Sequence, residues 1–153
     1  MNRTYSRPPR VIEADAEQAA ANVEITAAFV AEAVNEGDFT VLTDFAEPHI
    51  RDLSEPRVFV DGIGGLRTRI AAARRRMPDL YARIRDIRPA DIGSVQLCLA
   101  FSGTYVGDPM APTDRDGRVL HWHQHHLWFF SGDRACAHLG RIDRAAIDAA
   151  LHC

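Results

Sequence analysis

The stretch from Val119 to Ile142 reads VLHWHQHHLWFFSGDRACAHLGRI and carries five of the seven histidines of the chain. Apolar and polar side chains alternate through much of it, and a period of two places successive side chains on opposite faces of a β-strand. At its centre, Ser131–Gly132–Asp133 has the small and polar residues of a tight hairpin turn. The stretch therefore predicts two antiparallel strands, Val119–Phe130 and Arg134–Ile142.

Two earlier segments show the same alternation. Leu80–Arg88 predicts one strand, and Val95–Tyr105 predicts a longer one with an apolar face. The Gly107–Gly117 stretch contains two prolines and three aspartates, which indicates a long loop before the hairpin. The second half of the chain is therefore expected to form a meander of long antiparallel strands.

Helical patterns occupy the first half of the chain. Residues 14–36 are rich in alanine and place Phe29 on an apolar stripe at helical spacing. Gly37 is expected to end this helix, and Asp38 to cap a short second helix that runs through Phe45.

A third helix is predicted before Pro78, which would end it. Its apolar stripe consists of Ile63, Leu66, Ile70 and Ala73. The run Val58–Val60 just before it is expected to be extended, and Asp143 is expected to cap a short helix near the end of the chain.

Together these elements predict an α+β fold. Helices that precede a meander pack on one face of the sheet. We therefore expect a conical, curved antiparallel sheet packed against three N-terminal helices, with an apolar pocket inside the cone. The length of 153 residues suits one domain. The proline-containing residues 1–13 are expected to form a flexible arm, and residues 14–153 a single domain.

Composition excludes several classes of function. The formal net charge of −3 gives no reason to expect nucleic acid as a partner. All eighteen basic residues are arginine, so lysine Schiff-base chemistry is excluded. No apolar run suggests a secretory signal or a membrane segment. The three cysteines, Cys98, Cys136 and Cys153, lie far apart and favour a reduced, cytoplasmic protein without disulfides.

One face of the predicted strand Val119–Phe130 is mostly aromatic and apolar, and it carries one titratable group, His126. A histidine in a dry pocket is neutral near pH 7 and can accept a proton, which is what a general base requires. The indole N–H groups of Trp122 and Trp128 and the amide of Gln124 share this face and can donate hydrogen bonds to a developing enolate. The alternative for His126 is a core histidine with a hydrogen-bonded neighbour.

The opposite face of the same strand carries His121, His123 and His125. Histidines two residues apart on a strand can share a metal ion. No accompanying ligand motif is present, so a polar outer face or a subunit interface is favoured and no metal is predicted. The sequence also lacks a Gly–x–Ser–x–Gly elbow and a glycine-rich phosphate loop, which argues against a Ser–His–Asp hydrolase and a nucleotide-binding protein.

Three segments in this order resemble the SnoaL-like polyketide cyclases of the nuclear-transport-factor-2-like superfamily. They are FVAEAVNEGDFTVLTDF from Phe29, GLRTRIAAARRRMPDL from Gly65, and Ser102–Gly103–Thr104 followed by the strand pair from Gly117 to Asp143. The resemblance covers residues 25–151 and implies the conical fold. The same fold hosts cyclases, hydroxylases, isomerases, hydrolases and plain binders, so the resemblance specifies the reaction less closely.

The resemblance also assigns roles to residues of the strand pair. The family's acid/base aspartate falls on His126, a departure that keeps a proton acceptor but changes its chemistry. The histidine of the family's Glu–His–Trp motif falls on His138, which could form a pair of titratable groups with His126 if its face is inward. Asp52 and Tyr105 are further polar candidates at the pocket mouth, and Phe29 is assigned to the pocket wall.

These observations predict a cofactor-independent enzyme of aromatic polyketide or related secondary metabolism. His126, with His138, would abstract a proton before an intramolecular aldol-type ring closure in the pocket. The alternatives are a cofactor-free hydroxylase, an isomerase, an epoxide-opening enzyme and a non-catalytic binder. A small hydrophobic or aromatic substrate is expected, and the resemblance implies a homodimer or higher homo-oligomer formed through the outer sheet face.

Overall fold

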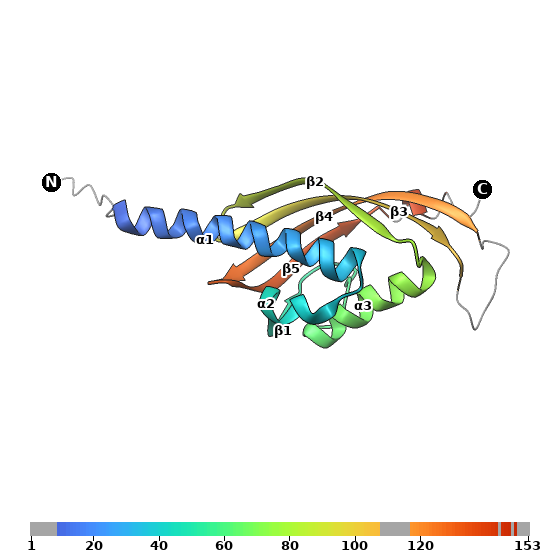
Figure 1. Ribbon diagram of the computed structural model, residues 1–153, viewed down its shortest axis with the longest axis horizontal. Helices are drawn as coiled ribbons and strands as arrows, with labels where there is room; N and C mark the ends of the chain where they lie inside the picture. The colour runs from blue at the N-terminus through green and yellow to red at the C-terminus, as the bar shows by residue number, and fades with distance from the viewer. Residues whose placement is uncertain (1–8, 108–116, 144, 148, 150–153) are drawn as a thin grey trace.

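The computed structural model describes residues 9–107, 117–143, 145–147 and 149 (Figure 1). Its five strands form one sheet in the order β1–β5–β4–β3–β2. Strands β2 to β5 pair antiparallel, as predicted, and each lies within two residues of its expected bounds. The strands are β1 Ala46–Asp52, β2 Tyr81–Ala90, β3 Ser94–Tyr105, β4 Arg118–Ser131 and β5 Arg134–Ile142.

Strand β1 makes the sheet mixed, because it pairs parallel with β5. This strand was not predicted. Its sequence AEPHIRD contains a proline and four residues that titrate, which do not form an apolar alternation. Its position at the edge of the sheet explains why the proline is tolerated.

The helices follow the predicted order with one change in form. Helix α1 spans Pro9–Ala28, so it begins before the expected residue 14, and it continues into a π-helix over Phe29–Asn35. A 3-10 turn, Phe39–Val41, and helix α2, Leu42–Phe45, then follow. Asp38 caps this turn as predicted, since its carboxylate accepts a hydrogen bond from the Thr40 backbone N–H at 3.0 Å.

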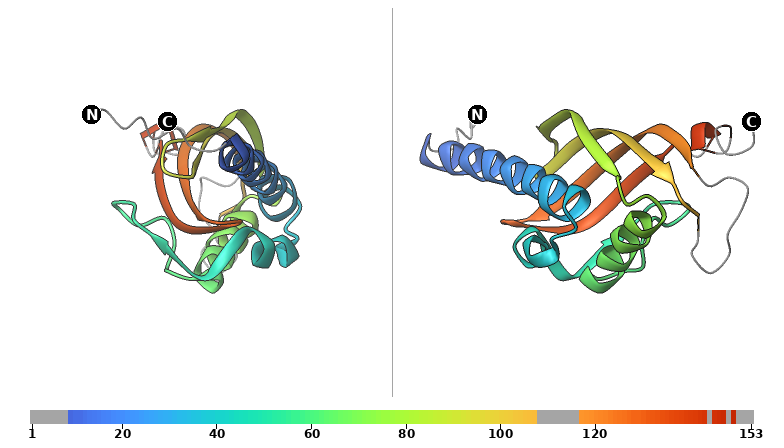
Figure 2. Two further views of the ribbon diagram at one scale, coloured as in Figure 1. Left: turned by 90° about the vertical axis from the view of Figure 1, so that its left-hand side faces the viewer. Right: turned by 45° about the vertical axis from the view of Figure 1, so that its right-hand side comes forward.

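Helix α3 spans Ile63–Arg76 and ends before Pro78, as expected. The helices lie on the concave side of the sheet, which bends around them into an open cone (Figure 2). The run Val58–Val60, expected to be extended, lies outside the five strands. The loop residues 108–116 and the first eight residues of the predicted arm lie outside the described part of the chain.

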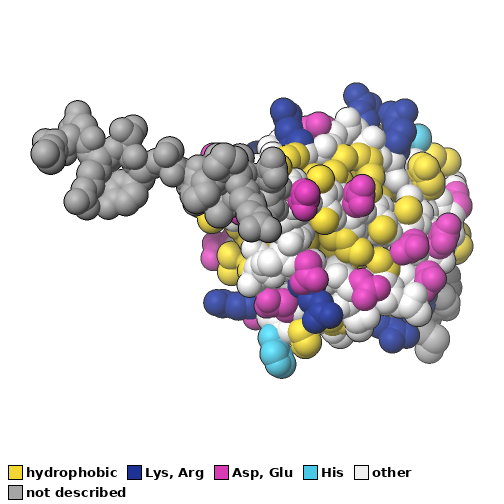
Figure 3. Space-filling view, turned by 60° about the vertical axis from the view of Figure 1, so that its left-hand side comes forward, with side chains coloured by type: hydrophobic (Ala, Val, Ile, Leu, Met, Phe, Trp, Pro, Cys, Tyr) yellow, Lys and Arg dark blue, Asp and Glu magenta, His cyan; other side chains and the backbone are white. Residues whose placement is uncertain are grey.

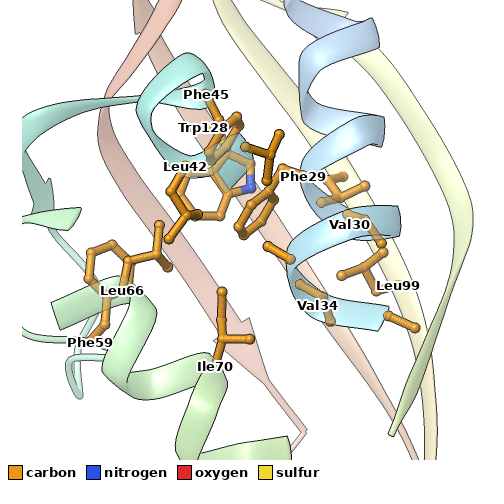
Figure 4. Close-up of a cluster of buried hydrophobic side chains, with 14 of the residues drawn as sticks. Phe29, Val30, Val34, Leu42, Phe45, Phe59, Leu66, Ile70, Leu99 and Trp128 are labelled. Atoms are coloured by element: carbon orange, nitrogen blue, oxygen red, sulfur yellow. The ribbon is translucent and has the colours of Figure 1, made fainter. Parts of the chain in front are cut away.

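Aromatic side chains from helices and sheet form the centre of the core. The rings of Phe29 and Phe45 stack at 4.3 Å, and both meet Trp128 edge-on at 5.4 and 5.0 Å (Figure 4). These side chains are almost completely buried, as are Leu42 and Ile50. This cluster joins the π-helix and α2 to the C-terminal part of β4.

The outer surface is mixed in character. On the side that Figure 3 shows, acidic side chains lie scattered among hydrophobic ones. Glu24, Glu32 and Glu36 are exposed, which agrees with an apolar stripe on the other side of their helix. Among the helices of the described residues, none is both long and apolar enough to cross a membrane.

Two adjacent glycines at the start of α3 have different surroundings. A Cβ atom at Gly65 would lie 1.7 Å from the carbonyl oxygen of Val60, so the helix approaches the preceding chain more closely than any other residue would permit. A Cβ atom at Gly64 would meet nothing within 4 Å. The glycine that opens the Gly–Leu–Arg segment therefore sets how closely α3 packs on residue 60.

The two positions form a matched pair for a test of this packing. Gly65→Ala should lower the free energy of unfolding by about 1–3 kcal/mol, because the backbone must move to admit the methyl group. Gly64→Ala should instead raise it by about 0.5–1 kcal/mol through the higher helix propensity of alanine. Urea unfolding followed by tryptophan fluorescence measures both, and equal effects would contradict the close approach.

Candidate active site

A cavity of about 310 Å³ lies between α3, the π-helix and the inner faces of β3 and β4. Most of its wall is aromatic or aliphatic, and this volume is enough for a small ligand. The predicted pocket residues of β4 all line it, because alternation along the strand turns them inward. They are Trp122, Gln124, His126 and Trp128, and Phe29 and Tyr105 join them from neighbouring elements.

The structure brings the two predicted catalytic histidines into contact. His126 on β4 and His138 on β5 lie on adjacent strands, and His126 Nδ1 is 2.7 Å from His138 Nε2. The side chains are 8% and 1% exposed, so water reaches neither ring freely. Both line the cavity.

Asp52 occupies a different place from the one expected. It does not line the cavity; it is buried beneath His138, and its Oδ1 is 2.9 Å from His138 Nδ1. The end of β1 brings it there, since Asp52 pairs with His138 across the parallel strands. Its role is therefore to contact the second histidine rather than to sit at the mouth of the pocket.

The carboxylate of Asp52 is surrounded by hydrogen-bond donors. It accepts hydrogen bonds from the backbone N–H and hydroxyl of Ser54 and from the backbone N–H groups of Val58 and Phe59. Burial alone would raise the pKa of Asp52, but the hydrogen bonds from Ser54, His138 and Phe59 outweigh it and lower the pKa to about 2. Asp52 is therefore ionised at neutral pH.

Gln124 extends this arrangement to four side chains. Its Oε1 lies 2.8 Å from His126 Nε2, and both residues line the cavity. In space, three contacts of hydrogen-bond length thus connect Asp52 to His138, His138 to His126, and His126 to Gln124.

Burial controls the charge of both histidines. It lowers the pKa of His126 to about 3, and the nearby rings of His138 and His125 act in the same direction, whereas Asp52 opposes them. Burial also lowers the pKa of His138, while the hydrogen bond from this ring to Asp52 and the charge of the carboxylate work against that change. These directions favour the neutral form of both rings at pH 7.

Two site residues were not predicted from the sequence. Gly140 lies opposite His126 on β5, and a Cβ atom there would lie 2.6 Å from His138 Cε1 and 3.1 Å from His126 Nδ1. Ser54 accepts a hydrogen bond from the Gly140 backbone N–H at 2.7 Å and donates one to Asp52 at 2.7 Å. Neither Gly140 nor Ser54 belongs to a sequence pattern that indicates a functional site.

The indole N–H groups of Trp122 and Trp128 are buried and have no hydrogen-bond partner among the described residues. Trp122 stacks on Phe101 at 5.1 Å, and Trp128 lies 4.2 Å from His138, ring centre to ring centre. Buried polar groups are usually hydrogen-bonded. Both side chains line the cavity, but their indole nitrogens are covered by neighbouring atoms, so a ligand would meet these donors only after a small movement of the rings.

The histidines of the outer face lie apart from this site. His121, His123 and His125 are exposed, and His125 Nδ1 lies 3.0 Å from Cys98 Sγ. In the part of the chain that the structure describes, no three side chains of the metal-binding types are grouped to hold an ion.

A family model of SnoaL-like polyketide cyclases matches residues 24–151. The chain belongs to the SnoaL-like polyketide cyclase family. The resemblance of the three sequence segments to this family is thereby confirmed, and the curved α+β sheet agrees with it. Comparison with curated proteins gives no match.

Solved structures of similar fold come from proteins with different proposed activities. TsrD from Streptomyces laurentii is 22% identical, with 87% of this chain and 96% of that one covered and a TM-score of 0.74. IdmH from Streptomyces antibioticus, proposed to be a polyketide cyclase, is 20% identical, with coverages of 86% and 99% and a TM-score of 0.71. AclR from Streptomyces galilaeus, proposed to be a hydroxylase, is 22% identical, with coverages of 89% and 96% and a TM-score of 0.67. Identities this low show a shared SnoaL-like fold.

The neutral histidines of this SnoaL-like protein should make its stability depend on pH. Because the pKa of His126 falls from 6.5 to about 3 on folding, the unfolded chain binds more protons below about pH 6.5. The free energy of unfolding should therefore be highest above pH 6.5 and decrease as the pH falls toward 3. The decrease is about 1.4 kcal/mol per pH unit for each proton that the unfolded chain binds and the folded protein does not. Asp52 should add a further loss between pH 3.8 and about 2.

Urea unfolding at pH 7, 6 and 5 measures this slope. His126→Asn should make the slope shallower by about one proton, whereas His123→Asn, which removes an exposed ring on the outer face of the same strand, should leave it unchanged. Equal slopes in the wild type and His126→Asn would contradict the buried neutral histidine.

Proposed function

We propose that this protein is a cofactor-independent cyclase-type enzyme of aromatic polyketide or related secondary metabolism. In this proposal His126 is the general base. The observation that carries it is an imidazole in the wall of an apolar cavity, whose Nδ1 is connected through His138 to the buried carboxylate of Asp52. A ring held in this way has a fixed orientation. Its other nitrogen, Nε2, which lies 2.8 Å from Gln124 Oε1, can meet a substrate when the amide of Gln124 turns away.

The proposed reaction begins at a carbon between two carbonyl groups. His126 Nε2 takes the proton of that C–H bond, and the electron pair of the bond remains on the substrate as an enolate. The enolate carbon then forms a bond to a carbonyl carbon elsewhere in the same molecule, and the resulting alkoxide recovers the proton. General base action contributes about a hundred- to ten-thousandfold, and a cavity that holds the substrate in a folded pose contributes by proximity.

The unpaired indole donors support the oxyanion part of this proposal. Trp122 lies two residues from Gln124 on the inner face of β4, and Trp128 lies two residues beyond His126. In a cavity with few other polar groups, an N–H donor stabilises a developing negative oxygen more strongly than it does in water. Trp122, Trp128 and Gln124 are therefore proposed to bind the carbonyl oxygens of the substrate, with Phe29 and Tyr105 in the wall.

A second reaction class remains compatible with the same residues. In the proposed alignment, His126 occupies the position of the family's acid/base aspartate, and AclR shows that the fold is shared by a protein proposed to be a hydroxylase. Hydroxylation, isomerisation and epoxide opening on this fold would also begin at the histidine. A non-catalytic binder would use the cavity without proton transfer, so proton transfer is the property to test first.

Solvent exchange provides a test that does not need the natural substrate. Ethyl benzoylacetate is an apolar aromatic probe with a methylene group between two carbonyls, and NMR in D₂O follows its loss of protons. The wild-type protein should accelerate exchange over buffer. His126→Asn should lower the catalysed rate by about a hundredfold or more, because asparagine keeps a donor toward His138 but has no basic nitrogen.

The control variant is His123→Asn on the outer face, which should retain the wild-type rate. Quenching of tryptophan fluorescence, which reports on a cavity lined by both tryptophans, should show that all three proteins bind the probe. Binding without any acceleration by the wild type would favour the non-catalytic binder. Wild-type exchange by His126→Asn would remove the base assignment.

We also propose a homodimer formed through the outer face of the sheet. Leu139 is 45% exposed there and pairs with the half-buried Leu127, and Val119, at the other end of β4, is 59% exposed. Exposed apolar side chains among histidines suit a contact that excludes water. Sedimentation should give twice the chain mass, and Leu139→Glu should reduce it to that of one chain; a monomeric wild type would contradict this proposal.

A further inference from the structure

The contacts among Asp52, His138, His126 and Gln124 restrict where protons can lie. Each of the three contacts joins two heavy atoms at 2.7–2.9 Å and therefore holds one hydrogen atom. Because Asp52 is ionised, the hydrogen of the first contact lies on His138 Nδ1. The positions of the other hydrogens then depend on the total number of protons in the chain.

With both histidines neutral, only one arrangement is possible. His138 already carries a hydrogen on Nδ1, so its Nε2 is bare and accepts the Nδ1 hydrogen of His126. His126 Nε2 is then bare as well and faces Gln124. In this state Gln124 has to present its NH₂ group to the ring, which requires the amide to be turned by about 180° from the orientation that places Oε1 at 2.8 Å from Nε2.

With one additional proton the arrangement is reversed. A hydrogen on His126 Nε2 is donated to Gln124 Oε1, which is the orientation of the amide in the structure. If His126 remains neutral, its Nδ1 is bare and accepts a hydrogen from His138 Nε2. His138 then carries two hydrogens and a positive charge, directly against the carboxylate of Asp52.

We propose that these four residues form a proton relay in which the charge of a captured proton rests on His138 and not on the base itself. The amide of Gln124 first turns away from His126 Nε2, and a proton of the substrate arrives at this nitrogen. The Nδ1 hydrogen of His126 then passes to His138 Nε2, and the amide returns with its oxygen toward the new N–H bond. One N–H bond forms at Nε2 and one moves between the rings, so His126 stays neutral and Asp52 stays a carboxylate. Return of the proton to the alkoxide reverses each step.

The catalytic use of the relay rests on the proposed function. Within that function, the relay explains how a buried histidine can be an effective base. An imidazole whose cation is strongly disfavoured by burial is a weak base when it acts alone. The charge of an imidazolium is much less costly beside a carboxylate than in an apolar wall, because opposite charges attract strongly at low dielectric constant. The directions of the pKa effects agree, since Asp52 favours the cation of His138 through both a hydrogen bond and its charge.

Other charged and titratable groups surround the pair. From α3, Arg69 and Arg76 line the same cavity, and Tyr105 lines it from β3. Asp61 accepts a hydrogen bond from the backbone N–H of Asp52 at 2.9 Å, and His125 lies on the outer face of β4. Among the described residues, Asp52 provides the one carboxylate that contacts either ring.

Nitrogen NMR of the free protein tests the relay without any substrate. The ¹⁵N shifts of the histidine rings distinguish the Nδ1–H form, the Nε2–H form and the imidazolium. At pH 8 both rings should be neutral with hydrogen on Nδ1. As the pH is lowered, His138 should become the imidazolium, and over the same pH range His126 should change to the neutral Nε2–H form.

An imidazolium signal from His126 at the first protonation would overturn the relay, as would a His126 ring that carries hydrogen on Nε2 at every pH. These results concern the free protein. They are therefore separate from the exchange assay, in which a wild type that gives no acceleration speaks against the proposed function instead.

Two substitutions of His138 separate a relay from simple positioning. His138→Gln places an amide oxygen where Nε2 accepts from His126, but it cannot take up a proton. It should bind ethyl benzoylacetate as the wild type does and lose about a hundredfold in exchange rate, with one imidazolium now forming on His126 at lower pH. His123→Gln is the matched control and should change neither property.

His138→Asn is the complementary variant, because its amide can still meet Asp52 but does not reach His126. It should lose the exchange rate to the same degree while thermal unfolding confirms a folded protein. If His138→Gln retains the wild-type rate, His138 only orients the base and the relay is wrong.

Discussion

The buried carboxylate of Asp52 organises the site. It accepts five hydrogen bonds, from the N–H and hydroxyl of Ser54, the N–H groups of Val58 and Phe59, and the ring of His138. A carboxylate removed from water is stable only when such donors replace the lost hydration. The irregular segment after β1 is consequently held in place by a charge, and the same charge fixes His138 in β5. Val58 and Phe59 line the cavity, so its wall and its titratable pair depend on one side chain.

The parts of this arrangement that follow a local repeat could be predicted from the sequence. In β4 the period of two determines which side chains face inward, and this period alone assigns Trp122, His126 and Trp128 to one face. The hairpin turn at Gly132 makes β5 the neighbour of β4, which brings His138 within reach of His126. Helix ends at Asp38 and Pro78 were equally predictable, because caps and prolines act within a few residues.

The parts that depend on distant contacts could not be predicted. Asp52 and His138 are 86 residues apart, and nothing in the sequence AEPHIRD indicates a strand that adds parallel to β5. The role of Ser54 follows from its contacts with Asp52 and Gly140, which exist only after the sheet has formed. The π-helical form of Phe29–Asn35 could not be predicted either, because the apolar stripe in this segment fits an α-helix equally well.

The absence of a side chain at Gly140 has a consequence for how such a site can arise or be redesigned. The two rings use the space that a methyl group at this position would fill, so residues 126, 138 and 140 are not free to vary independently. The ring of His138 lies nearest to this space, at 2.6 Å from the position of a Cβ atom, and the ring of His126 follows at 3.1 Å, so a shorter side chain at position 126 alone would not admit a larger residue at position 140. The order of substitutions therefore matters. If histidines are introduced at positions 126 and 138 while position 140 still carries a side chain, the three residues overlap. If glycine is introduced at position 140 first, they do not.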